Sequence, residues 1–310
     1  MNDVNKRMRS PMAVAWVSLV SNILLTLVKF MVGWLYRSPS LVADGAHNAS
    51  DVVASAATLG SMRVSTMPAD REHPYGHGKA EVIASGIVAV ILFLAAIWMI
   101  YQSIEALFLP PPKAHAISLI ATVFSLLFKL VLYIYTIRIG RKVNSKGLIA
   151  TAYDHLSDVY SSLAAAIGIG LALLGRQARI PYLEYGDPLA SIVVSLLILK
   201  VAIHMGREAV DILMERNVAQ EKLDQFAAII SAVPGVKRID RIRAREHGHY
   251  ILVDVRVGVP GEMTVQEGHD ISRAIKKNVM ERFDDVQEVL VHINPWYENE
   301  SAVKANEVDY

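Results

Sequence analysis

Four acidic and imidazole side chains fall into two pairs with helical spacing. His47 and Asp51 stand four residues apart in one largely apolar segment, and Asp154 and Asp158 stand four apart in another. Residues at i and i+4 share one face of an α-helix, so each pair offers two metal-binding side chains from a single face. Ionisable side chains at the depth of a bilayer are costly and usually mark a site or a pathway. The two pairs therefore predict a four-ligand cation site buried in a membrane bundle.

The composition favours an integral membrane protein. The 310 residues are 53% hydrophobic and 20% charged, and the mean hydropathy is +0.33. A formal net charge of only +1 argues against a broad nucleic-acid-binding surface. The absence of cysteine excludes disulfides and thiolate metal sites. The basic N-terminus precedes an apolar stretch longer than the core of a cleavable signal peptide, so we expect it to be a retained first span.

Six apolar segments are long enough to cross a hydrocarbon core, which requires roughly 20 residues. They cover residues 11–36, 40–66, 81–108, 114–138, 148–175 and 186–212. The second and fifth are rich in Ala, Ser and Gly, which let helices pack closely, so these two are predicted at the centre of the bundle. We therefore expect residues 1–212 to form a six-helix transmembrane domain.

The distribution of Lys and Arg predicts the orientation. Cytoplasmic loops carry an excess of these residues. They gather before the first span, between the second and third, between the fourth and fifth, and after the sixth, at Lys6, Arg7, Arg9, Arg63, Arg71, Lys79, Arg138, Arg141, Lys142, Lys146, Arg207 and Arg216. Both termini should face the cytoplasm, and we expect the protein in a bacterial inner (plasma) membrane.

A small α+β domain is predicted to follow, at residues 213–296. The expected elements are a helix over 221–233, strands over 236–245 and 250–259, a helix from about 264 to 283, and a last strand over 288–293. Thr264 and Glu267 form a capping-box pattern for the second helix. The order αββαβ favours helices on one face of a sheet. The polar residues 297–310 are expected to be a disordered tail.

Three motifs make the chain resemble the cation diffusion facilitator family. They are SLVADGAHNASD at 40–51, PADREHPYGHGKAE at 68–81 and AYDHLSD at 152–158. The resemblance spans residues 10–296. It implies a homodimeric antiporter that exchanges a divalent metal for protons, with a ferredoxin-like, metal-chaperone-like cytosolic domain for regulation and dimerisation. It implies no prosthetic group.

The resemblance also implies roles for individual residues. His47, Asp51, Asp154 and Asp158 match the family's transport site. A second site on the loop between spans two and three matches Asp70, His73 and His77, and a site in the cytosolic domain matches His292 and, less closely, His269. Asn294 and Asp240 depart from the pattern of that last site. Lys79 matches a lysine of an interprotomer salt bridge, with Glu215 as the candidate partner.

Other polar residues in the spans have structural interpretations. Asp44 lies on the face of His47 and Asp51 and is expected to be a vestibule or structural acid. His155 points away from Asp154 and is expected to contact a neighbouring helix. Lys29 and Lys129 can snorkel or pair with an acid, and neither is assigned a role in transport.

The predicted function is export of a divalent transition metal from the cytosol in exchange for protons. One imidazole and three carboxylates form an oxygen-rich set, which favours Mn²⁺ or Fe²⁺, with Zn²⁺ next. A ligand must lose its proton to bind metal, so metal and protons compete for the site. Two alternatives remain open: a membrane-embedded metalloenzyme, disfavoured because every acid is already used as a ligand, and a metal-sensing assembly subunit.

Overall fold

The chain folds into a helical unit and a small α+β domain. The structure, a computed structural model, describes residues 2–111, 114–142 and 146–298. The predicted tail falls mostly outside this range. The chain divides into two compact units, Met1–Leu59 with Ser85–Gly206 and Gly60–Ala84 with Arg207–Tyr310. The end of α2, the loop that follows it and the start of α3 thus belong with the C-terminal residues.

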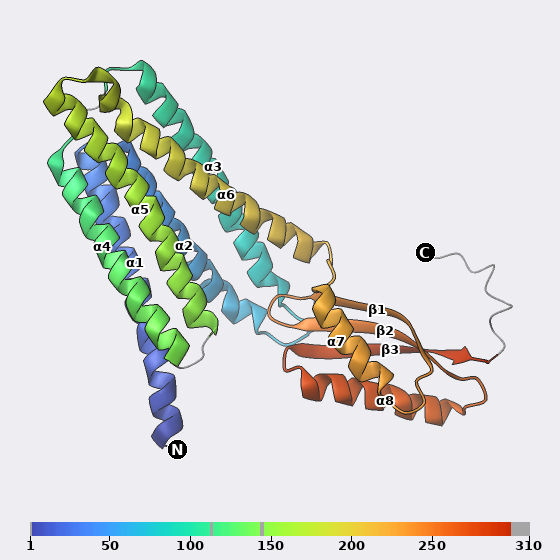
Figure 1. Ribbon diagram of the computed structural model, residues 1–310. Coiled ribbons are helices and arrows are strands. Elements are labelled where there is room, and N and C mark those ends of the chain that lie inside the picture. Colours follow the sequence, from blue (N-terminus) through green and yellow to red (C-terminus); the bar gives the residue numbers. More distant parts are fainter. Residues whose placement is uncertain (1, 112–113, 143–145, 299–310) are drawn as a thin grey trace. The chain divides into compact units, whose positions relative to one another are not determined.

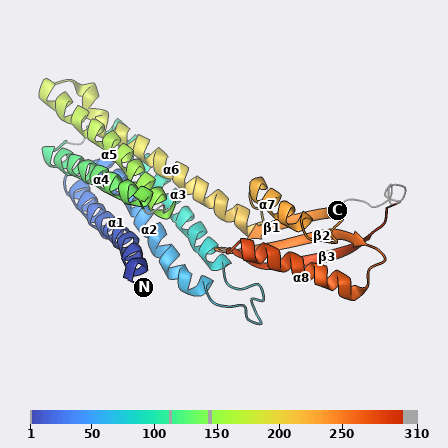
Figure 2. The ribbon, with the colours of Figure 1, turned by 60° about the horizontal axis from the view of Figure 1, so that its bottom comes forward.

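Six long helices contribute to the helical unit (Figure 1). Their bounds are α1 (Asn2–Leu35), α2 (Pro39–Ser65), α3 (Lys79–Phe108), α4 (Ala116–Lys142), α5 (Lys146–Ala178) and α6 (Gly186–Leu213), with a short 3₁₀ helix η1 (Pro181–Tyr185) before α6. Helix α4 packs against both α1 and α5, and α1, α2 and α5 lie close together in the ribbon (Figure 2).

Five helices of the described chain are long and apolar enough to cross a membrane by length and composition. The spans are Trp16–Leu35, Lys79–Phe108, Ala116–Lys142, Thr151–Ala178 and Pro181–Leu213. Helix α2, the second of the six expected spans, has 27 residues but does not reach this apolarity. It carries Asp44, His47, Asn48 and Asp51, and the first three are buried inside the unit. Its polar content therefore follows from its place in the interior.

The start of α2 is fixed by an acid on another helix. Asp187, at the beginning of α6, accepts a 2.7 Å hydrogen bond from the Ser38 hydroxyl and a 2.9 Å hydrogen bond from the backbone N–H of Ser40. A carboxylate at a helix N-terminus satisfies N–H groups that have no partner within the helix and favours the helix dipole. This contact positions the helix that carries His47 and Asp51.

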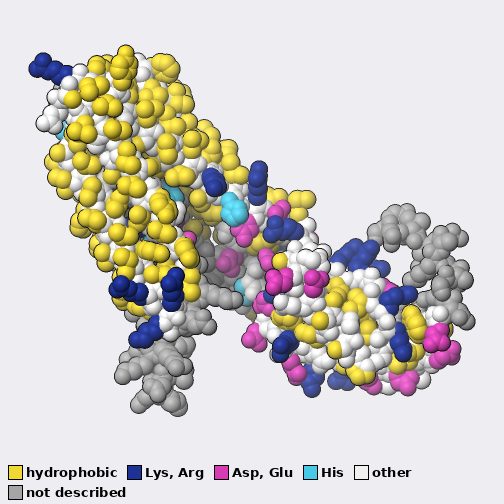
Figure 3. Space-filling model, viewed as in Figure 1, with side chains coloured by type: hydrophobic (Ala, Val, Ile, Leu, Met, Phe, Trp, Pro, Cys, Tyr) yellow, Lys and Arg dark blue, Asp and Glu magenta, His cyan; other side chains and the backbone are white. Residues whose placement is uncertain are grey.

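Apolar side chains cover the visible face of the helical unit, whereas the visible face of the α+β domain carries charges of both signs (Figure 3). Large exposed side chains on the helices include Leu24, Ile91, Val131 and Leu174. A surface of this kind is stable against lipid and would be costly in water. The prediction of a helical membrane region is thus confirmed.

The α+β domain has the predicted order of elements. It consists of α7 (Gln220–Ser231), β1 (Arg238–Glu246), β2 (Ile251–Pro260), α8 (Val265–Arg282) and β3 (Val286–Trp296). The sheet order is β1-β2-β3, with β1 and β2 antiparallel and β2 and β3 parallel. The Thr264–Glu267 capping box at the start of α8 is also confirmed.

The core of this domain explains its fold. Alternate residues of β2 point to one face of the sheet, and Val253, Val255 and Val257 are buried there against Phe226 of α7 and Ile275 of α8. The helices place their apolar faces on this side of the sheet, which is the arrangement that the αββαβ pattern predicts.

Candidate metal centres

Three of the four predicted transport-site side chains converge inside the helical unit. His47 and Asp51 come from α2, and Asp158 comes from α5. The Nε2 atom of His47 lies 3.8 Å from Oδ1 of Asp158, and the Asp51 carboxyl group is close enough to Asp158 to interact with it electrostatically. His47 and Asp158 are buried, with 5% and 1% of their surfaces exposed.

Two atoms at this place make no hydrogen bond to the described residues, namely His47 Nδ1 and Asp158 Oδ1. A buried polar atom without a partner is costly. A cation coordinated by an imidazole nitrogen and carboxylate oxygens would remove part of that cost. The donor set therefore fits a divalent metal as cargo.

Asp154 lies one helical turn before Asp158 on α5, and its side chain is exposed. It is close enough to repel Asp158 electrostatically. The structure thus brings together His47, Asp51 and Asp158 and leaves Asp154 at the margin of the cluster.

A buried lysine is part of the same cluster. Lys129 of α4 forms an ion pair with Oδ2 of Asp158 and donates a 2.6 Å hydrogen bond to Oδ1 of Asn22. His155 places Nε2 2.9 Å from the Ser18 hydroxyl oxygen of α1 and Nδ1 3.9 Å from Oδ2 of Asp158. Sequence reasoning gave Lys129 no role in transport. The available signal was a lysine near the middle of an apolar span.

A second buried ion pair lies nearer the start of α2. The ammonium of Lys29 is 2.8 Å from Oδ2 of Asp44, and both side chains are fully buried. Asp44 also accepts hydrogen bonds from Ser161 and Ser162 of α5, and Lys29 donates to Asn48. This network joins α1, α2 and α5, so Asp44 has the contacts of a structural acid.

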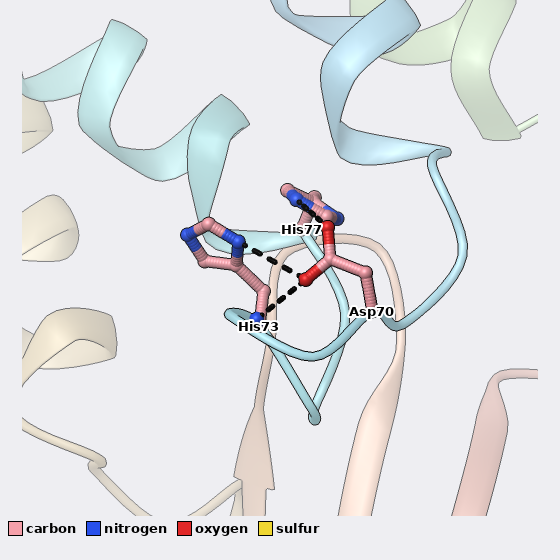
Figure 4. Close-up of side chains that lie close together, drawn as sticks. All are labelled: Asp70, His73 and His77. Atoms are coloured by element: carbon pink, nitrogen blue, oxygen red, sulfur yellow. Dashed lines mark hydrogen bonds and ion pairs between the residues drawn. The ribbon is translucent and has the colours of Figure 1, made fainter.

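A second candidate centre lies on the loop between α2 and α3 (Figure 4). One ligand atom from each of Asp70, His73 and His77 lies within 4.8 Å of the others. His73 Nδ1 is 3.5 Å from Oδ1 of Asp70, and His77 Nε2 is 3.4 Å from Oδ2. Among the residues that the structure describes, this is the only group of three such side chains with that spacing.

The loop backbone fixes the acid of this group. The backbone N–H groups of His73 and Glu72 donate hydrogen bonds of 2.6 and 2.9 Å to Oδ1 of Asp70. The bond from His73 is the main reason why the pKa of the Asp70 carboxyl lies below its ordinary value. An ionised carboxylate beside two imidazoles is a suitable donor set for Zn²⁺ or a similar cation.

The same loop packs on the turn between β1 and β2. The Tyr250 hydroxyl donates a 2.6 Å hydrogen bond to the carbonyl oxygen of Tyr75. Gly78 is buried, and a Cβ at this position would overlap the carbonyl oxygen of His247. Gly248 has φ +74 and lies against Gly78. Glycine at both positions permits this close backbone contact.

Ion pairs reinforce this contact. The Lys79 ammonium is 2.5 Å from Oε1 of Glu215, and Arg245 Nε is 2.8 Å from Oε2. Burial raises the pKa of the Glu215 carboxyl, but the hydrogen bond from Lys79 and the charge of Arg245 outweigh it, so that pKa is lowered. The resemblance implied a bridge from Lys79 to a second protomer, whereas here Lys79 and Glu215 pair within one chain.

The two histidines predicted as ligands in the α+β domain line one groove of about 450 Å³. His269 comes from α8 and His292 from β3, and both are exposed. His292 Nε2 lies 3.0 Å from Oδ1 of Asn294, and Asn294 donates a 2.7 Å hydrogen bond to Asp240. Asn294 and Asp240, where the sequence departs from the family pattern, thus contact each other beside His292.

Comparisons with known proteins match both parts of the chain. The family described as "Cation efflux transmembrane domain" matches residues 15–214, and the family described as "Cation efflux protein, cytoplasmic domain" matches residues 218–296. The chain is 44% identical to the manganese efflux system protein MneP of Bacillus subtilis (strain 168), over 92% of this chain and 96% of that protein.

Two further relatives are more distant. The manganese efflux system protein MneS of Bacillus subtilis (strain 168) is 32% identical over 86% of this chain and 90% of its own length. Metal tolerance protein 2 of Oryza sativa subsp. japonica is 33% identical over 89% of this chain and 76% of its own length.

Proposed function

Because this chain belongs to the cation diffusion facilitator family of metal efflux transporters, we propose that its cargo is Mn²⁺, exported from the cytosol in exchange for protons. The observation that carries the proposal is the convergence of His47, Asp51 and Asp158 inside a membrane-spanning helical unit. The family and its named members are metal transporters and not enzymes, as predicted.

The donor chemistry supports manganese. The cluster offers the imidazole of His47 and the carboxyl groups of Asp51 and Asp158, and a third acid, Asp154, lies at its margin. Oxygen-rich sets favour Mn²⁺ and Fe²⁺ more than imidazole-rich sets do. Two relatives of this chain are named manganese efflux proteins. We place Fe²⁺ second and Zn²⁺ third.

Proton exchange follows from competition at one site. The carboxyl groups of Asp51 and Asp158 and the imidazole of His47 bind metal only after they lose their protons. Protons that enter from the opposite side would displace the cargo and reset the site. The buried cluster supports this coupling because charges interact more strongly in its low-dielectric surroundings than in bulk water.

The proposal also includes the membrane, the oligomeric state and the orientation of the protein. We place the protein in a bacterial plasma membrane as a homodimer, with both termini in the cytoplasm. The excess of Lys and Arg in the loops on that side supports the orientation. The cytosolic domain and the Asp70, His73 and His77 cluster would then face the pool from which metal is taken, with His269 and His292 as further candidate ligands.

Transport into proteoliposomes tests the proposal. Wild-type protein should move Mn²⁺ faster than Fe²⁺, Co²⁺ and Zn²⁺, and an imposed pH gradient should accelerate the flux. Asp154→His should shift the preference toward Zn²⁺. Transport of Zn²⁺ alone by the wild type would contradict the manganese assignment, and flux that does not respond to the pH gradient would contradict proton exchange.

The second candidate function, a metal-sensing subunit, must be distinguished from a transporter. It predicts that His47→Ala and Asp158→Ala leave function intact and that His292→Ala abolishes it. A transporter predicts loss of flux in the first two variants. The same vesicle assay on all three variants distinguishes the two functions.

A further inference from the structure

Lys129 is fully buried in the middle of the helical unit. It lies on α4, with 0% of its surface exposed, beside a carboxylate of the transport site. Its ammonium contacts two other helices, through the ion pair with Asp158 of α5 and the 2.6 Å hydrogen bond to Asn22 of α1. A buried lysine is costly unless it is paired, and this one is paired with a residue that binds cargo.

The two carboxylate oxygens of Asp158 have different neighbours. Lys129 binds Oδ2, and His155 Nδ1 lies 3.9 Å from the same atom. The other oxygen, Oδ1, faces His47 Nε2 at 3.8 Å and has no hydrogen-bond partner in the described part of the chain. Lys129 thereby holds one oxygen and leaves the other directed toward His47.

Lys129 also sets the charge of the site. Asp51, Asp158 and, at the margin of the site, Asp154 carry three negative charges when ionised, and the ammonium of Lys129 offsets one of them. The neighbouring Lys29–Asp44 pair contributes no net charge. Two negative charges remain, which a divalent cation neutralises. Charge left unbalanced in a buried site is strongly unfavourable.

We propose that Lys129 is a positioning and selectivity residue that matches the transport site to a divalent cargo, by orienting Asp158 and by offsetting one of the three acids. The inference rests on the proposed function, because it concerns the same site. A cation bound between His47 and Asp158 would lie close to the ammonium and would be repelled by it. That repulsion lowers affinity and speeds release, which a transporter requires.

Removal of the charge should tighten binding and slow turnover. Lys129→Gln keeps an N–H donor and loses the charge, so the KM for Mn²⁺ should fall by about tenfold and the maximal rate should fall as well. The Coulomb energy scales with the charge of the ion, so inhibition by Tb³⁺ should strengthen by about thirtyfold. Lys129→Arg keeps the charge, so the ratio of the Tb³⁺ and Mn²⁺ affinities should stay close to that of the wild type.

A second variant changes the charge without removing the lysine. Asn22 accepts a hydrogen bond from Lys129, so Asn22→Asp places a negative charge against the ammonium. It should reproduce the effects of Lys129→Gln on Mn²⁺ and Tb³⁺. Asn22→Ala is the matched control, because it loses the hydrogen bond and adds no charge, and it should leave the ratio of the Tb³⁺ and Mn²⁺ affinities unchanged. This pair keeps the inference testable if Lys129→Gln does not fold.

The experiment measures Mn²⁺ flux with Tb³⁺ as inhibitor in proteoliposomes, and the dissociation constants of both ions for the full chain in detergent. The ion binding that remains in Asp158→Asn is subtracted, because it comes from sites other than the transport site. Equal shifts in the dissociation constants of Mn²⁺ and Tb³⁺ would overturn the inference, and so would unchanged constants in both Lys129→Gln and Asn22→Asp. The same shifts in Lys129→Arg as in Lys129→Gln would also overturn it. If the wild type transports no metal but the dissociation constants shift as expected, the proposed function fails and the role of Lys129 stands.

Discussion

The imidazole of His47 and the carboxylate of Asp158 face each other across α2 and α5, with Nε2 and Oδ1 3.8 Å apart. Each residue belongs to one of the two spaced pairs in the sequence, and the packing of the two helices brings them together. Atoms at this separation are too far apart for a strong hydrogen bond. A cation between them can bind both, so the relationship favours a shared ligand over a direct contact.

Asp158→Asn is expected to abolish most Mn²⁺ transport. Loss of a partner outside the coordination shell typically costs about 10- to 100-fold in metal affinity, so loss of a ligand itself should cost about 100-fold or more. His47→Ala should act in the same direction. Initial rates of Mn²⁺ uptake by proteoliposomes measure the effect.

Asp211→Asn is the matched control for this prediction. Asp211 is also an ion-paired aspartate, with Arg216 as its partner at 2.6 Å, but 44% of its side-chain surface is exposed. The same substitution there should leave uptake near the wild-type rate. Comparable losses in the two variants would show that the effect is not specific to the buried cluster.

Asp154→Asn should impair transport less than Asp158→Asn. The side chain of Asp154 is exposed, whereas that of Asp158 is buried beside His47 and Lys129. The loss should be about tenfold or less, the lower end of the range for a residue outside the coordination shell. The apparent affinity for Mn²⁺, measured from the concentration dependence of uptake, provides the comparison. A loss as large as that of Asp158→Asn would make Asp154 a direct ligand.

The sequence predicted the elements well because their signals are local. The i,i+4 spacing of His47 and Asp51, the alternation of Val253 and Val255, and the Thr264 capping box each depend on neighbouring residues. The five apolar spans and the order αββαβ follow from such patterns.

Contacts between distant residues could not be predicted in this way. Lys129 and Asp158 are 29 residues apart on different helices, and their ion pair depends on how α4 and α5 are rotated. The exposure of Asp154 depends on the same packing. Tyr250 contacts the backbone of Tyr75 across 175 residues. No periodicity encodes such pairs, so only the assembled structure shows them.

Gly78→Ala is expected to loosen the loop that carries Asp70, His73 and His77. Its Cβ would overlap the carbonyl oxygen of His247, and a forced overlap typically costs about 1–3 kcal/mol. Amide hydrogen exchange of residues 72–80 should become faster. Gly60→Ala is the control, because a Cβ there meets nothing within 4 Å. Unchanged exchange in Gly78→Ala would show that the loop does not depend on this contact.

Docking of the same loop should weaken as the pH falls below the ordinary histidine range. Burial and the charge of Lys79 lower the pKa of the His247 imidazole, while Glu215 opposes this shift and Arg245 adds to it. Between the lowered pKa and the ordinary value of 6.5, the undocked state binds more protons than the docked state. The contribution of His247 to docking is therefore fully present above pH 6.5. It is lost progressively as the pH falls from 6.5 through the lowered pKa.

Protection factors of residues 72–80, measured at pH 7.5 and pH 5.5, test this dependence. They correct for the effect of pH on intrinsic exchange. The ion pairs of Glu215 should not contribute in this window, because the pKa of that carboxyl lies below its ordinary value of 4.5. His247→Gln should remove the response, and a response that persists in this variant would assign it to another group.

The loop should bind one cation independently of the transport site. Asp70, His73 and His77 offer two nitrogens and one oxygen within 4.8 Å of one another, and a water molecule can complete a tetrahedral shell. Co²⁺ reports such a shell by its visible absorption. His77→Ala should therefore lower the Co²⁺ stoichiometry by one and remove that absorption, while Asp158→Asn should leave it in place. His249→Ala, at an exposed histidine near the same turn, is the control and should match the wild type. If His77→Ala binds as much Co²⁺ as the wild type with an unaltered spectrum, the three side chains do not form a metal centre.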